Sequence, residues 1–146
     1  MSNRKYGWWG YVKDIIRRYP DLCAELKEIK TQNIVPHYSA LPSGGGDNMR
    51  KAEATALRTL SPVKMRELEA MESALRLTRN MRDGAERERM IDLVFWRQTH
   101  TLSGAAMKVN VSKRTAERWH TEFIKCVAGF YGFELEKNAQ VGVKSS

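Results

Sequence analysis

The stretch 101–127 constrains the fold of this chain more than any other part of the sequence. Its second half carries apolar residues at intervals of three and four, which is the spacing of one face of an α-helix. These residues are Ala116, Trp119, Phe123 and Val127. We predict a short helix over 101–109, a turn at Asn110-Val111, and a long helix from Lys113 to about Ala128.

The residues around the predicted turn suit two helices that cross at a steep angle. Such a crossing requires a small side chain, which Ala105 or Ala106 supplies. Asn110 tolerates a left-handed backbone, and Val111 provides an apolar residue beneath the turn. Ser112 is a favourable N-cap for the helix that follows. The pattern predicts a helix-turn-helix, and the alternative is an ordinary helical hairpin with a solvated basic face.

The rest of the chain also shows helical spacing, and no segment alternates apolar and polar residues as a strand would. We therefore predict an all-α fold. Prolines and the run Gly44-Gly45-Gly46 indicate a flexible linker before the main helical domain. The predicted parts are an N-terminal helical segment (1–32), the flexible linker (33–48), connecting or oligomerisation helices (49–84), the helix-turn-helix domain (85–133) and a frayed tail (134–146).

Four residues mark the expected ends of the other helices. Pro20 is expected to kink or divide the first helix, unless it opens a second one. Ser61 and Pro62 suit the start of the next helix. Within that helix, charged residues such as Glu67 fill the positions between the apolar ones. Gly84 is expected to close that helix in a left-handed conformation.

The charge of the chain favours a polyanionic partner. The formal net charge is +8, and within 101–127 five basic residues stand against two acidic ones. We expect Arg114 and Arg118 to contact base edges of double-stranded DNA in the major groove. Phosphate contacts are expected from Lys108, Ser112, Lys113 and Thr115. Glu117, Thr121 and Lys125 complete the set of candidate DNA-binding residues.

The stretch from Glu86-Arg87-Glu88-Arg89 through Val109 to Thr115 resembles region four of bacterial sigma factors. It is also similar to the C-terminal half of the RinA/ArpU-type phage late-gene transcriptional activators. The resemblance implies a sequence-specific regulator that activates late genes of a phage or prophage, with host RNA polymerase as a further candidate partner. Because one such motif buries limited surface, we expect a homodimer on two half-sites.

Two other functions fit an all-helical DNA-binding chain of this size. One is the small terminase subunit, which recognises phage DNA for packaging and forms large rings. The other is a protein-interaction module that binds polymerase without DNA. A solution mass separates a monomer or dimer from a ring, and failure to bind any DNA at low salt would favour the interaction module.

Enzymatic and metal-dependent functions lack support in the sequence. No nucleophile, phosphate-loop or metalloprotease motif is present, and the cysteines Cys23 and Cys126 form no metal-binding pair. The three histidines have no ligand spacing, so we expect no metal and no cofactor. Without a signal-peptide pattern or an apolar run long enough to span a bilayer, we expect a cytoplasmic protein with no membrane partner.

Aromatic residues near the N-terminus have two interpretations. Trp8 and Trp9, with tyrosines on either side, either form an exposed patch for a partner or cover one end of the core, and we favour the second. His120 lies on the long C-terminal helix, and we expect it to border the core rather than to touch DNA.

Overall fold

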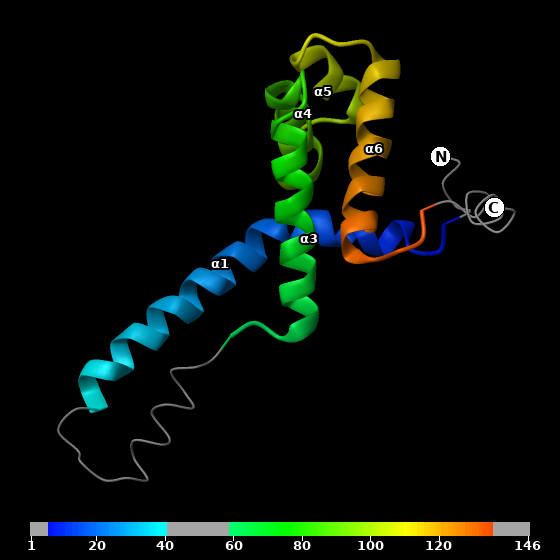
Figure 1. Ribbon diagram of the computed structural model, residues 1–146. Helices are drawn as coiled ribbons and strands as arrows, with labels where there is room; N and C mark the ends of the chain where they lie inside the picture. The colour runs from blue at the N-terminus through cyan, green and yellow to red at the C-terminus, as the bar shows by residue number, and fades with distance from the viewer. Residues whose placement is uncertain (1–5, 41–58, 136–146) are drawn as a thin grey trace, which may run out of the picture. The chain divides into compact units, whose positions relative to one another are not determined.

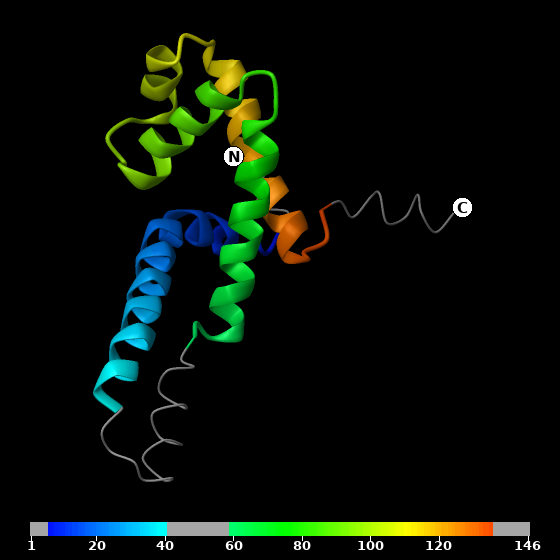
Figure 2. The same ribbon diagram turned by 60° about the vertical axis from the view of Figure 1, so that its left-hand side comes forward.

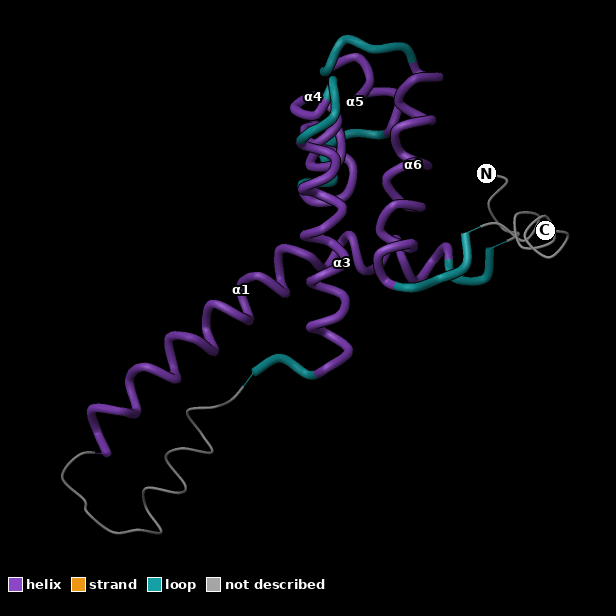
Figure 3. The backbone as a smooth tube through the Cα atoms, viewed as in Figure 1, coloured by secondary structure: helices purple, strands orange, loops and turns teal. Residues whose placement is uncertain are grey.

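The computed structural model describes residues 6–40 and 59–135. These residues form helices, turns and loops without a strand, so the predicted all-α class is confirmed (Figures 1 and 3). None of their helices combines the length and the apolar character needed to cross a membrane. In chain order the elements are α1 (Trp9–Ala40), α3 (Pro62–Arg79), α4 (Gly84–Ile91), the π-helical segment η3 (Asp92–Trp96), α5 (Leu102–Lys108) and α6 (Lys113–Tyr131).

The chain divides into two compact units. The larger is formed by Met1–Tyr19 with Arg66–Ser146, and the smaller by Pro20–Met65. All the residues predicted to bind DNA belong to the larger unit.

The smaller unit contains the start of α3, which begins as the sequence predicted. The Ser61 hydroxyl accepts a hydrogen bond from the backbone N–H of Lys64 at 3.2 Å, and Pro62 occupies the first helical position. The Lys64 ammonium pairs with the carboxylate of Glu25 at 3.0 Å. Both charges are partly exposed, so this pair contributes little stability.

The predicted start of the linker at residue 33 is wrong, because α1 continues to Ala40. The helix runs through Pro36, which the prediction treated as a helix-breaking residue. A proline removes one helical hydrogen bond and crowds the preceding turn, but its own φ is close to the helical value. Residues 41–48 of the predicted linker and residues 49–58 of the predicted helix lie outside the described residues.

Helix α1 also continues through Pro20. Of the alternatives predicted there, a division of the helix and the start of a second helix are therefore wrong, while the predicted kink stays a prediction. Proline has no backbone N–H, which leaves the carbonyl of Ile16, four residues earlier, without its usual helical partner. The indole N–H of Trp96 donates to this carbonyl at 2.8 Å. Trp96 ends the π-helical segment η3, where the Arg97 N–H bonds to the carbonyl of Asp92 five residues back.

Every helix of the larger unit contributes side chains to its hydrophobic core. The N-terminal part of α1 crosses α3 and the C-terminal half of α6 (Figures 1 and 2). Tyr11 on α1 contacts both helices, through hydrogen bonds to Glu67 of α3 and Tyr131 of α6. The largest fully buried apolar side chains are Val12, Ile15, Ile16, Met71, Leu75, Met90, Ile91, Phe95, Ile124 and Val127.

The N-terminal aromatic residues cover one end of this core, as we favoured from the sequence. Trp8 stacks on Phe133, with ring centroids 5.8 Å apart, and its indole N–H donates to the carbonyl of Glu134 at 2.9 Å. Leu135 packs against the core cluster. Glu134 and Leu135 therefore belong to the packed part of the larger unit, although the prediction assigned them to a frayed tail. Residues 136–146 lie outside the described part of the chain.

Gly84 does not close α3 in a left-handed conformation, as we had predicted. Gly84 is the buried first residue of α4. Its φ is not positive, since Gly132 is the only described glycine with a positive φ. A Cβ atom on Gly84 would lie 2.6 Å from the carbonyl oxygen of Thr78 and 2.7 Å from that of Arg79. Glycine is needed here because the backbone of α3 approaches too closely for a side chain.

We expect Gly84→Ala to lower the free energy of unfolding by about 2 kcal/mol, because the obstructing atoms are backbone and cannot rotate away. Urea unfolding followed by circular dichroism measures the change. Gly10→Ala is the matched control: Gly10 lies in α1 with open space around it, so alanine should be neutral or stabilise by up to about 1 kcal/mol. Equal effects of the two substitutions would contradict the explanation.

Candidate nucleic-acid interface

Helices α5 and α6 and the turn between them lie where the sequence predicted. Thr101 caps α5, accepting a hydrogen bond from the Gly104 N–H at 3.1 Å. Asn110 has a φ of 60°, the left-handed conformation that asparagine tolerates. The hydroxyl of Ser112 then accepts from the Thr115 N–H at 3.0 Å and caps α6. The turn between α5 and α6 is thus formed by the side-chain and backbone preferences of adjacent residues.

Small residues allow the two helices to pack closely. Ala105 and Ala106 of α5 and Ala116 of α6 are all buried. On α6, Trp119 and Phe123 continue the buried face. The predicted core face of the long helix is therefore confirmed, and the opposite face is directed outward.

The outward face of α6 collects most of the predicted DNA-binding residues. Lys113, Arg114, Glu117 and Arg118 are exposed on its first two turns, and Ser112 is exposed at the cap. Lys108 is exposed at the end of α5, just before the turn. We call these six residues the α6 basic face; they lie at the end of α5, at the cap and on the first two turns of α6. Figure 2 shows the arrangement of the helices that carry them.

Three cations of the α6 basic face have no partner in the part of the chain that the structure describes. Within residues 6–40 and 59–135, Lys108, Lys113 and Arg114 form no ion pair and no side-chain hydrogen bond. Lys113 and Arg114 occupy the first turn of α6, which contains no acidic residue. The helix dipole places partial positive charge at this end, so each cation there is unfavourable by about 0.3–1 kcal/mol. A bound anion would relieve this repulsion.

Arg118 differs from the other three because it is partly neutralised. Its guanidinium lies 3.7 Å from the carboxylate of Glu122, one turn further along α6. The same carboxylate accepts a shorter bond, 2.9 Å, from Arg87 of α4. Arg87 also lies over the ring of Trp119, with its guanidinium carbon 5.0 Å from the ring centroid. Glu122 therefore holds a largely buried arginine and an exposed one.

Three predicted residues are not part of the α6 basic face. Thr115 is half-buried, and its hydroxyl accepts a hydrogen bond from Ser112 at 3.0 Å, so its role is in the cap. Thr121 is half-buried on the flank of the helix. Lys125 lies about three turns from the helix start, with its ammonium 5.7 Å from the ring centroid of Tyr6. The geometry places Lys125 with the N-terminal aromatic residues instead.

Two further residues lie near this face: Arg87, whose contacts the sequence did not reveal, and His120, which the sequence placed correctly. Arg87 lies in a run of alternating charges, Glu86 to Arg89, that looks like an ordinary solvated helix start. His120 stacks flat on Phe95, with centroids 5.3 Å apart, which confirms that it borders the core. Burial and the nearby charges of Lys13 and Arg17 lower the pKa of His120 to about 4. The imidazole is therefore neutral at physiological pH and adds no charge to this face.

No group of three or more His, Cys, Asp or Glu side chains in the described residues could hold a metal ion.

Comparison with protein-family models, with curated proteins and with solved structures gave no match.

Proposed function

We propose that the protein binds double-stranded DNA by placing the N-terminal half of α6 in the major groove. The observation that carries this proposal is the pair of cations at the start of α6, Lys113 and Arg114, which have no partner among the described residues and lie where the helix dipole opposes positive charge. A phosphate backbone supplies the missing anions, and an α-helix fits the major groove. The capped turn and the buried alanines support the proposal by fixing α6 rigidly against α5.

Specific recognition in this proposal falls to Arg114. It is exposed, it has no partner in the described residues, and its planar guanidinium can donate two hydrogen bonds to one guanine. Lys108 and Lys113 flank it and would contact phosphates. The resemblance of this region to sigma-like regulators makes transcriptional regulation of phage or prophage genes the proposed role, with a dimer as the binding unit.

Arg114→Ala is expected to weaken binding by about 1–3 kcal/mol and to relax the preference at one base-pair position. The measurement is selection from a pool of random duplexes, followed by fluorescence titration of the selected sequence. Arg76→Ala is the control, because Arg76 is an exposed arginine on α3 without an ion pair in the described residues, and its loss changes the net charge equally. Unchanged sequence preference in Arg114→Ala, or an equal loss in Arg76→Ala, would contradict the assignment.

Glu122→Gln is expected to raise affinity for DNA severalfold at low salt, because it frees Arg118 and removes a negative charge beside the α6 basic face. The same substitution should lower stability by about 1 kcal/mol, since Arg87 loses its carboxylate. Titrations at several salt concentrations, together with urea unfolding, separate the two effects. Weaker DNA binding by a folded Glu122→Gln protein would show that Glu122 does not restrain this face.

The regulatory role is tested separately from DNA binding. Selection of bound fragments from the genome that encodes the chain should recover sites upstream of genes. Fragments without any shared sequence would leave DNA binding intact but contradict sequence-specific regulation.

A further inference from the structure

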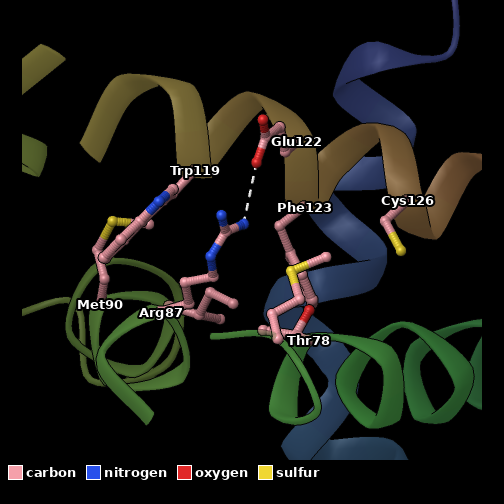
Figure 4. A pocket seen from close by; sticks show the side chains of 9 residues that line it. Thr78, Arg87, Met90, Trp119, Glu122, Phe123 and Cys126 are labelled. Atoms are coloured by element: carbon pink, nitrogen blue, oxygen red, sulfur yellow. Dashed lines mark hydrogen bonds and ion pairs between the residues drawn. The ribbon is translucent and has the colours of Figure 1, made fainter. Parts of the chain in front are cut away.

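A small cavity lies between α3, α4 and α6, beneath the outward face of α6. Its volume is about 20 Å³. Thr78 of α3, Arg87 of α4, and Trp119, Glu122 and Cys126 of α6 contribute to its wall (Figure 4). Figure 4 shows the guanidinium of Arg87 entering between Trp119 and Phe123 and bonding to Glu122.

Within residues 6–40 and 59–135, two N–H groups of the lining residues have no hydrogen-bond partner. They are Nε of Arg87 and Nε1 of Trp119, and both atoms are buried. Trp119 is only 3% exposed, so its indole has no access to bulk solvent. A buried donor without an acceptor costs about 1–3 kcal/mol. Because Arg87 and Trp119 both line this cavity, one acceptor placed in it is the simplest partner for the two donors.

We propose that this cavity binds one ordered water molecule, which accepts hydrogen bonds from Arg87 Nε and Trp119 Nε1. The water can donate its own hydrogens to the oxygen atoms of Glu122 and Thr78, which line the same cavity. A single water needs roughly 10–15 Å³ of such space and two to four polar partners. The cavity satisfies both requirements.

The size and charge of the cavity favour water over an anion. A phosphate or sulfate is too large for about 20 Å³. The positive charge of Arg87 is already compensated by Glu122 at 2.9 Å, so no further negative charge is needed. Burial raises the pKa of the Cys126 thiol, which therefore contributes no charge to the wall.

The bound water would join α4 to α6 through Arg87 and Trp119. It would hold Arg87 in the position from which its Nη1 atom bonds to Glu122. This inference concerns the packing beneath α6 and holds whether or not the protein binds DNA.

Nuclear magnetic resonance on the full chain tests the proposal. In a rotating-frame experiment, the indole hydrogen of Trp119 should show a dipolar cross-peak at the water frequency, with the sign that separates it from hydrogen exchange. The indole of Trp96 donates to the Ile16 carbonyl at 2.8 Å and is the internal control, for which no such peak is expected. A Trp119 indole without a dipolar water peak would overturn the proposal.

A crystal structure provides the second test. We expect one solvent peak within hydrogen-bonding distance of both nitrogens. Crystals soaked in bromide should show no anomalous signal at this position. A bromide peak at this position would show that the cavity binds a halide ion instead of water. A hydrogen bond from either nitrogen to a protein acceptor would show that no ligand is needed. Each of these outcomes overturns the proposal.

Discussion

Replacing Arg18 by methionine is expected to lower the free energy of unfolding by about 3 kcal/mol, although Arg18 is partly exposed and lies far in sequence from its partner. That partner is Glu67, a carboxylate only 2% exposed at the crossing of α1 and α3. Methionine keeps most of the volume of the arginine stem, so the loss should come from the charge rather than from packing.

The geometry around Glu67 explains the size of the effect. Arg18 donates two hydrogen bonds to the carboxylate, at 3.0 and 3.4 Å, and the hydroxyl of Tyr11 donates a third. Burial and the bond to Glu67 raise the pKa of Tyr11, so the phenol keeps its hydrogen and remains a donor. Without Arg18, the buried negative charge of Glu67 would keep only one neutral donor, Tyr11. Removing one partner of a buried ion pair is strongly destabilising, because the charge that remains is not compensated.

Two further variants separate this explanation from a simple loss of packing. The double variant Arg18→Met with Glu67→Met should recover most of the lost stability, since apolar residues often replace a buried ion pair without penalty. Arg17→Met is the surface control: Arg17 pairs with Asp14 in the open, and its loss should cost at most about 0.5 kcal/mol. Urea unfolding measures all three. A double variant less stable than Arg18→Met alone would contradict the account.

Glu67 also shows where reasoning from the sequence fails. Its spacing placed it among the charged residues that fill the solvent side of a helix, whereas it is buried in the structure. The position of Glu67 depends on α1 supplying Arg18 and Tyr11, 49 and 56 residues away in sequence. Single-sequence spacing contains no information about such a partner.

Features set by near neighbours in sequence were predicted correctly. The cap at Ser112, the left-handed Asn110 and the buried face of α6 each depend on a few adjacent residues. Other features depend on how separate helices pack against one another, and two of these were predicted wrongly. Helix α1 passes Pro20 with Trp96 bonded to the carbonyl that the proline leaves free, and Gly84 is required by the approach of α3 rather than by its own φ.

The same contrast applies to the candidate DNA-binding residues. Helical periodicity placed Arg114 and Arg118 outward, and both are exposed. It could not distinguish Arg114, which has no ion pair with any described residue, from Arg118, whose partner Glu122 is also shared with Arg87 of another helix. Nor could it place Lys125 beside Tyr6, because the packing of the N-terminal residues on α6 is a tertiary contact.

Lowering the pH from 7 to 5 is expected to reduce the free energy of unfolding by about 2 kcal/mol through His120 alone. The pKa of His120 is lowered from an ordinary 6.5 to about 4 by burial and by the positive charges of Lys13 and Arg17. Between these values the unfolded chain binds a proton that the folded chain does not, so acid favours unfolding. As the pH rises well above 6.5, the imidazole becomes neutral in both states and the effect disappears.

The test compares urea unfolding of the protein and of His120→Gln at several pH values between 7 and 5. The substitution removes the stacking on Phe95 and lowers stability at every pH, so the informative quantity is the slope. We expect the slope of stability with pH to flatten in His120→Gln across this window. Glu88, whose pKa is lowered mainly by its bond to Arg79, loses its stabilising contribution as pH falls below about 4.5 and therefore adds little above pH 5. An unchanged slope in His120→Gln would show that the folded protein protonates this imidazole as readily as the unfolded chain does, and that the positive charges of α1 do not act on it.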